Sequence, residues 1–212
     1  MSRGRFVTLE GGEGAGKTTQ VRLLVDALNA AGIDAVATRE PGGAPGAERI
    51  RNLLVSGAAD RWDPLTETLL HIAARREHVA RTVAPALERG AWVISDRFAD
   101  STMAYQGYGQ GVPRATIEAL HAAALGGLQP NLTLILDLPV EAGLARADAR
   151  GDTATRYERM GTDFHRRLRD GFLDIARREP ARCIVLDATG GVDTVQRRIR
   201  DAVAARLGVT GL

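Results

Sequence analysis

One glycine-rich stretch carries the clearest chemistry in this 212-residue sequence. It reads GGEGAGKTT from Gly11, which places Gly11, Gly16, Lys17 and Thr18 at the spacing of a phosphate-binding loop. Glycines let backbone N–H groups turn inward around phosphate oxygens, the lysine adds positive charge, and the threonine hydroxyl can ligate Mg²⁺. We therefore expect a nucleoside triphosphate to be bound by this run: Gly11, Gly12, Glu13, Gly14, Ala15, Gly16, Lys17, Thr18 and Thr19.

The loop also has the neighbours that it needs. Residues 6–10 read as a buried strand, and residues 18–31 read as a helix with an apolar stripe that stops at Gly32. The positive end of such a helix favours phosphate. Lys17 is the only lysine in the chain, and every other basic residue apart from the histidines is an arginine. The sequence therefore predicts a donor-phosphate site at residues 11–19.

Short apolar runs alternate with longer helical patterns along the whole chain. The runs predict strands at 6–10, 35–38, 92–95, 132–137 and 183–187, with helices at 18–31, 46–56, 64–89, 114–125, 139–149, 161–178 and 192–206. Such alternation is typical of a parallel sheet covered on both faces. We expect an α/β fold with a five-stranded parallel sheet, formed as a single domain over residues 1–212.

Composition narrows the classes of partner. The formal net charge is +2, aromatic residues make up 4% of the chain, and no basic stripe with interleaved aromatics is present, so we expect no nucleic-acid partner. Cys183 is the only cysteine, which excludes an internal disulfide. No apolar run approaches 18 residues and no leader-like segment is found, so we expect a cytoplasmic protein without a membrane partner.

A second site is indicated where the strand at 92–95 ends. Asp96 can hold Mg²⁺ together with Thr18, and the Arg97 guanidinium can bind a phosphate with two parallel hydrogen bonds. A GTPase would more often have Asp-x-x-Gly after this strand and a later Asn-Lys-x-Asp. Asp96 is instead followed by Arg-Phe-Ala, and the chain has no second lysine. These residues argue against a GTPase.

The sequence resembles the bacterial thymidylate kinases over nearly its whole length and in the same order. The segments that carry the resemblance are Glu10 to Thr19, TREPGG at 38–43, AAR at 73–75, DRF at 96–98, STMAYQG at 101–107, and Asp137 with the arginine-rich segment after it. The resemblance implies phosphorylation of dTMP to dTDP by ATP and Mg²⁺, which supplies dTTP for DNA synthesis. It also implies a P-loop NTPase-like fold and a homodimer.

The resemblance assigns roles at the acceptor site. Arg97 and Arg51 should hold the acceptor phosphate, and Arg75 and Gln106 the edge of the thymine ring, whose O4 accepts and whose N3–H donates. Thr102, one helical turn before Gln106, should face the same base, Tyr105 should pack near the sugar, and Glu13 should lie near the 3′-hydroxyl or a metal-bound water. The implied dTMP set is Glu40, Arg51, His71, Arg75, Arg97, Thr102, Tyr105 and Gln106.

His71 departs from the family pattern, which commonly has phenylalanine there to stack on thymine. An imidazole can also stack, but it titrates near neutral pH. We therefore expect dTMP binding that is weaker or pH-sensitive relative to a His71→Phe variant.

Gly14 also departs from some members, which carry an arginine at that position of the loop. Members without it use arginines of a lid, here expected near residues 146–160, and a lid arginine can contribute on the order of 10³-fold in rate. Arg150 and Arg156 are the preferred candidates, with Arg146 behind them. The expected catalytic set is Lys17, Arg97, Arg150, Arg156 and Glu13. The resemblance places the adenine of ATP at residues 187–191.

Two other functions stay open on sequence alone. A deoxynucleoside kinase or another nucleoside monophosphate kinase would share the loop, and a nucleoside kinase would use Glu40 or Glu13 to activate a neutral hydroxyl. A P-loop ATPase acting as a binding or assembly module would share it as well. Two arginines at the acceptor site suit a substrate that already carries a phosphate.

Overall fold

The computed structural model describes residues 4–58, 60–149 and 155–212. Five strands form one parallel sheet in the order β2-β3-β1-β4-β5, which confirms the predicted α/β sheet. The strands are β1 (Phe6–Glu10), β2 (Ala35–Arg39), β3 (Trp92–Asp96), β4 (Leu132–Asp137) and β5 (Cys183–Asp187). All five match the predicted runs to within one residue.

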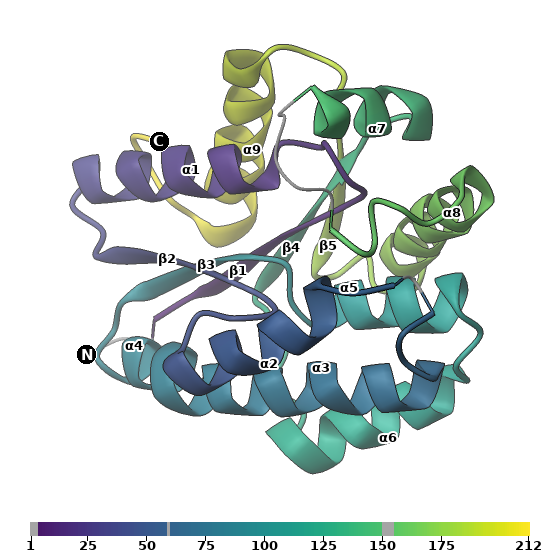
Figure 1. Cartoon of the computed structure of the whole chain (residues 1–212). Coiled ribbons are helices and arrows are strands. Elements are labelled where there is room, and N and C mark those ends of the chain that lie inside the picture. The colour runs from purple at the N-terminus through teal and green to yellow at the C-terminus, as the bar shows by residue number, and fades with distance from the viewer. Residues whose placement is uncertain (1–3, 59, 150–154) are drawn as a thin grey trace.

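Alternate residues of the central strands bury on opposite faces of the sheet. Leu134 and Leu136 pack with α1 (Lys17–Ala30) and α9 (Val192–Leu207), whereas Ile135 packs with α8 (Thr162–Arg178). Figure 1 shows α1 and α9 together over one face of the sheet. Both faces are covered, which explains why these strands read as unbroken apolar runs.

The other face is covered by the segments that contain the residues predicted for the acceptor site. They are α2 (Pro45–Val55), α3 (Pro64–His78), η1 (Val79–Val83), α4 (Ala84–Glu88), α5 (Ala99–Thr102), η2 (Met103–Gly109) and α6 (Arg114–Leu125), with α7 (Val140–Asp148) following β4. In Figure 1, α2, α3 and α6 lie on the side of the sheet opposite α1 and α9. The helix predicted over 64–89 is present, but its turn at Val79–Val83 is π-helical.

The helical segment at 99–109 is absent from the predicted list of helices. It starts two residues after Arg97 and consists of one short α-helical turn followed by a π-helix that contains Gly107 and Gly109. In the π-helical part, each backbone hydrogen bond joins residues five apart along the chain. The side chains there do not form the apolar stripe with a period of 3.6 residues that predicts an α-helix. Tertiary packing therefore decides the structure here.

The strand order places the two predicted sites side by side. β1 lies between β3 and β4, and the register aligns Leu9 with Asp96 and Glu10 with Ile135. The phosphate loop that follows β1 and the Asp96–Arg97 pair that ends β3 thus leave the same edge of the sheet. Ligands of open parallel sheets bind at this edge, where the strand order changes direction.

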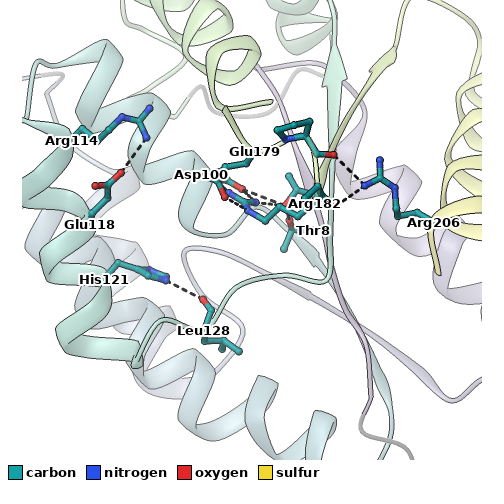
Figure 2. Close-up of polar contacts among 12 residues, drawn as sticks. Thr8, Asp100, Arg114, Glu118, His121, Leu128, Glu179, Arg182 and Arg206 are labelled. Atoms are coloured by element: carbon teal, nitrogen blue, oxygen red, sulfur yellow. Dashed lines mark hydrogen bonds and ion pairs between the residues drawn. The ribbon is translucent and has the colours of Figure 1, made fainter. Parts of the chain in front are cut away.

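A buried polar cluster ties the sheet to the start of the acceptor segment. Arg182 donates to both carboxylate oxygens of Asp100, each at 2.7 Å (Figure 2). It also donates to Thr133 Oγ1 at 2.8 Å. Thr133 in turn shares a 2.9 Å hydrogen bond with Thr8. The cluster joins β1, β4 and the residue before β5 to α5, and so fixes where α5 begins. Within the described ranges, no helix is both long and apolar enough to cross a membrane.

Candidate active site

The phosphate loop wraps around the ammonium group of Lys17. Its Nζ donates to the carbonyl oxygens of Gly12 at 2.7 Å and Gly11 at 3.2 Å, and the residue is buried. Gly16 caps helix α1 in the left-handed region, with φ +86°. Burial, reinforced by the nearby Arg97, lowers the pKa of Lys17 to about 8, although Glu13 and Asp96 act in the opposite direction. A bound polyphosphate would favour the charged form.

Gly14 sits where no side chain fits. Its φ is +67°, and a Cβ atom added there would overlap the carbonyl oxygen of Gly143 on α7. A Cβ atom on Gly143 would in turn overlap the carbonyl oxygen of Glu13. The two backbones therefore approach each other through paired glycines, which leaves no room for an arginine at position 14.

Thr18 and Asp96 meet at the open end of the loop. The Thr18 hydroxyl donates to Asp96 Oδ2 at 2.5 Å, and both residues line the phosphate-loop cavity. These are oxygen ligands, which suit Mg²⁺, and Mg²⁺ sites use few protein ligands alongside phosphate oxygens and water. No cluster of three or more His, Cys, Asp or Glu side chains suited to a metal occurs among the described residues, so a protein-only cage is not formed there.

Arg97 connects the phosphate loop to the acceptor cavity. Among the described residues it is the one non-glycine with positive φ, at +72°. Its Nη1 donates to the Gly11 carbonyl at 2.9 Å and to Ser101 Oγ at 3.1 Å, and its Nη2 pairs with Glu13 at 3.2 Å. Residues held in this sparsely populated backbone region cluster at functional sites. The guanidinium borders both cavities.

Glu13 is held as a carboxylate. Burial alone would raise its pKa, but the charges of Arg97 and Lys17 and a 2.5 Å hydrogen bond from the Tyr105 hydroxyl lower the pKa to about 2. The group is therefore ionised at neutral pH and can only accept hydrogen bonds. Glu13 lines both the acceptor cavity and the phosphate-loop cavity, and its expected place near the 3′-hydroxyl stays a prediction.

The acceptor cavity has a volume of about 110 Å³. Seven of the eight residues predicted for dTMP line it: Glu40, Arg51, His71, Arg75, Arg97, Tyr105 and Gln106. Glu13 lines it as well. Arg51 donates to the Pro41 carbonyl at 2.8 Å and also borders the phosphate-loop cavity. Arg51 and Arg97 thus each line both cavities.

Thr102, the eighth residue, differs from expectation. It does not line the cavity; its hydroxyl accepts a hydrogen bond from Arg75 Nη2 at 2.9 Å. The side chain is buried and contacts Arg75. Its contact with the base stays a prediction, and the contact that the structure shows is the one with Arg75.

A chain of buried hydrogen bonds fixes Arg75. Glu40 accepts from Arg75 Nε at 2.6 Å and bonds His78 Nδ1 at 2.9 Å, and His78 Nε2 reaches Thr38 Oγ1 at 2.6 Å. Arg75 Nη2 also donates to the Phe98 carbonyl. His78 was missed from the sequence, although its position three residues after Arg75 places both on one helix face.

Glu10 and Ser101 were also missed. Glu10 is fully buried and accepts from the Phe98 amide at 2.7 Å and from Ser101 Oγ at 2.6 Å. Burial, with the nearby Asp100, raises the pKa of Glu10 to about 8. Ser101 links this carboxyl group to Arg97 and lines the acceptor cavity. A strand-end glutamate gave no local signal for this role.

His71 lines the cavity, but the expected pH sensitivity is not supported. Its Nε2 bonds the Tyr157 hydroxyl at 2.8 Å, and burial with the nearby Arg75 and Arg156 lowers the pKa of His71 to about 3. The imidazole is therefore neutral throughout the range in which it was expected to titrate. A comparison with His71→Phe then reports on ring shape and hydrogen bonding.

The lid arginines separate into three cases. Arg146 lines the phosphate-loop cavity and donates to the carbonyls of Ala188 and Thr189, both at 3.2 Å. Arg150 lies outside the described residues. Arg156 differs from expectation: it is fully buried in an ion pair with Glu67 and does not line the phosphate-loop cavity. The Glu67 carboxylate holds the Arg156 guanidinium in the protein interior.

Comparisons with known proteins show the family of the chain. Residues 9–199 match the family model described as thymidylate kinase. The chain is 60% identical over 209 residues to a thymidylate kinase of Caulobacter vibrioides, covering 99% of this chain and 100% of that protein. It is 50% identical to one of Bradyrhizobium sp. strain ORS 278, covering 97% and 92%.

A solved structure is similar as well. The crystal structure of a thymidylate kinase from Ehrlichia chaffeensis superposes with a TM-score of 0.76 at 36% identity, covering 95% of this chain and 99% of that one.

The paired glycines give a testable consequence. In Gly143→Ala, the new methyl group should push α7 away from the Glu13 carbonyl, with an overpacking cost of about 1–3 kcal/mol. We expect kcat/KM for the nucleoside triphosphate to fall about tenfold, together with a lower Tm. Gly161→Ala is the matched control, because its φ is −63° and a Cβ atom there meets no atom of the described residues within 4 Å. Steady-state kinetics that leave Gly143→Ala equal to this control would contradict the packing argument.

Proposed function

The chain belongs to the thymidylate kinase family, and we propose that its own residues carry out phosphoryl transfer from ATP to dTMP around a single guanidinium, that of Arg97. The enzyme converts dTMP to dTDP and so supplies dTTP for DNA synthesis. The observation that carries the residue assignment is the position of Arg97, which contacts the phosphate loop and lines the acceptor cavity at once. The comparisons give no support to a nucleoside kinase or an assembly ATPase.

The donor side is assigned to the loop from Gly11 to Thr19. Its backbone N–H groups and Lys17 would hold the phosphates of ATP, and α1 would add its positive end. Arg146 borders the same cavity and binds the carbonyls after β5, where the adenine is expected. It therefore replaces Arg156 as the lid residue best placed near the donor.

The acceptor side is assigned to the cavity that contains Arg75 and Gln106. Arg51 and Arg97 would neutralise the dTMP phosphate, and Arg75 would donate to O4 of thymine. Glu40 and Thr102 hold Arg75 from behind. Tyr105 and His71 border the cavity, where a ring can pack against the sugar or the base.

Mg²⁺ is proposed as the divalent metal, with Thr18 and Asp96 as its protein ligands. Both are hard oxygen donors at the mouth of the loop, and they fit the small ligand set that Mg²⁺ takes beside a nucleotide. When bound, the ion would neutralise charge on the donor phosphates during transfer.

The residues at the centre perform positioning and charge neutralisation. The attacking group is an ionised phosphate oxygen, so no general base is needed. Arg97 and Lys17 offset the charge that gathers between donor and acceptor, and Glu13 keeps Arg97 in place by an ion pair. Arg150 remains a proposed lid residue. We also propose a single domain over residues 1–212 with a lid near 146–160, acting in the cytoplasm.

A panel of acceptors tests the function directly. Purified enzyme should release ADP from ATP with dTMP far faster than with dUMP, dCMP, AMP or thymidine, measured by a coupled assay. Thymidine should be inactive because it lacks the phosphate that Arg51 and Arg97 bind. Equal turnover of thymidine and dTMP would overturn the assignment of the two arginines, and no turnover of dTMP would overturn the function.

The pKa of Lys17 gives a pH prediction. In the free enzyme the pKa is about 8, so Lys17 is charged below that pH and neutral above it. We expect kcat/KM for ATP to fall as the pH rises through about 8, whereas kcat at saturating ATP should hold to higher pH because bound phosphates favour the ammonium form. In Lys17→Arg, whatever its absolute rate, this alkaline fall should vanish. A kcat/KM that stays flat to pH 9.5 would contradict the assignment.

A homodimer is proposed through the outer face of α2 and α3. Leu53 on α2 is 41% exposed, and Leu65 and Leu69, one turn apart on α3, are 44% and 47% exposed. The two helices pack against each other, and Figure 1 shows them side by side on the outer side of the molecule. Large apolar side chains grouped in this way are typical of a contact surface.

Replacement of Leu69 by arginine tests the dimer. Leu69→Arg would bury an unpaired charge in the proposed contact, so we expect a monomer by sedimentation at micromolar concentration, against a wild-type dimer. Val192→Arg is the control, because Val192 is 52% exposed but lies on α9, on the far side of the sheet. Monomeric wild-type protein, or a Val192→Arg variant that alone dissociates, would refute this surface.

A further inference from the structure

A buried carboxylate lies one layer behind the base end of the acceptor cavity. Glu67, on α3, has no exposed surface and does not line the cavity. Its Oε1 accepts from Gln106 Nε2 at 2.7 Å, Gln110 Nε2 at 3.0 Å and the Tyr157 hydroxyl at 2.9 Å. The Arg156 guanidinium pairs with its other oxygen. Glu67 therefore receives donors from η2 and its C-terminal cap on one side and from the 156–157 segment on the other.

In the Gln106 side-chain amide, the nitrogen has a hydrogen-bond partner and the oxygen has none among the described residues. Its nitrogen donates to Glu67, whereas its oxygen is buried with no partner among the described residues. Gln106 is also one of the residues that line the acceptor cavity. Buried amide oxygens are almost always hydrogen-bonded in native proteins, so this oxygen awaits a donor that a ligand can supply.

The carboxylate leaves the amide only one orientation. An ionised carboxylate accepts hydrogen bonds and cannot donate them. If the amide turned by 180°, two acceptor oxygens would face each other at the position now held by a 2.7 Å hydrogen bond. We propose that Glu67 is a positioning residue that fixes the Gln106 oxygen towards the base and thereby selects thymine over cytosine. This inference rests on the proposed assignment of the acceptor cavity to dTMP.

The two bases differ at the atoms that this arrangement presents. Thymine offers a donor at N3–H and an acceptor at O4, which match the Gln106 oxygen and the Arg75 guanidinium. Cytosine offers an acceptor at N3 and a donor amino group at C4, so both contacts would bring like groups together. A site built to hydrogen-bond one pattern rejects the other because its buried groups are left unpaired. Discrimination therefore requires that the amide cannot turn.

Glu67→Gln removes that restriction while keeping the size of the side chain. Arg156, which can only donate, should hold the new amide oxygen, so the new amide nitrogen would point at Gln106. Gln106 can then turn its own oxygen inward and present Nε2 to the base. We expect the ratio of kcat/KM for dTMP to kcat/KM for dCMP to fall at least about tenfold, the equivalent of one hydrogen bond. Both substrates are measured on the same preparation, so loss of folded protein cancels.

Two further variants keep the test sharp. Gln110→Leu removes a hydrogen bond to the same Glu67 oxygen but leaves the carboxylate in place, so the dTMP/dCMP ratio should stay at the wild-type value. The double variant Glu67→Gln with Arg156→Met removes both charges of the buried pair and so leaves no unpaired buried charge. Its ratio should also fall below the wild-type value, because no carboxylate then fixes the amide.

The outcomes separate the inference from the function. A wild-type ratio retained in every Glu67→Gln protein that folds, with both substrates slowed equally, would show a purely structural role and overturn the inference. An equal fall in Gln110→Leu would overturn it too, because that variant keeps the carboxylate. Wild-type enzyme without dTMP turnover would instead overturn the proposed function, whatever the variants do.

Discussion

The ion pair between Arg97 and Glu13 is the contact on which the site depends. Glu13 belongs to the phosphate loop after β1, and Arg97 follows β3, so the pair joins two strands at the edge of the sheet. It forms because the register aligns Leu9 with Asp96 and because the Arg97 backbone adopts a positive φ. The backbone strain is held by hydrogen bonds from Arg97 to Gly11 and Ser101. Donor and acceptor phosphates would meet at this pair.

Buried carboxylates also orient the hydrogen-bond donors around the acceptor cavity. Glu40 holds Arg75, and Glu67 holds Gln106. Burying a charge is unfavourable unless it is well paired, so these contacts are weak sources of stability. They are useful because a carboxylate that only accepts leaves its neighbours no second orientation. The site is preorganised because these carboxylates cannot donate a hydrogen bond, so each neighbouring donor is held in one orientation.

The sequence predicted the features whose residues are close together along the chain. The loop from Gly11 to Thr19 and the five strands belong to this group, whereas the cavity positions of Arg51, Arg75, Tyr105 and Gln106 were implied by the family resemblance. It did not indicate contacts between residues that are distant along the chain: Arg156 meets Glu67 from 89 residues away, and Thr102 meets Arg75 from 27 residues away. Such contacts depend on how the helices pack, and local patterns of charge and hydropathy do not encode that packing.

Gly14 shows how the fold limits where a catalytic arginine can be placed. An arginine in the loop would need a Cβ atom at a position already filled by the Gly143 carbonyl, and it would need a positive φ as well. The same close approach brings α7, and with it Arg146, against the phosphate-loop cavity. The space that excludes an arginine from the loop is thus occupied by the helix that carries one. In this fold, the Gly143 carbonyl therefore both excludes a side chain at position 14 and holds α7 against the loop.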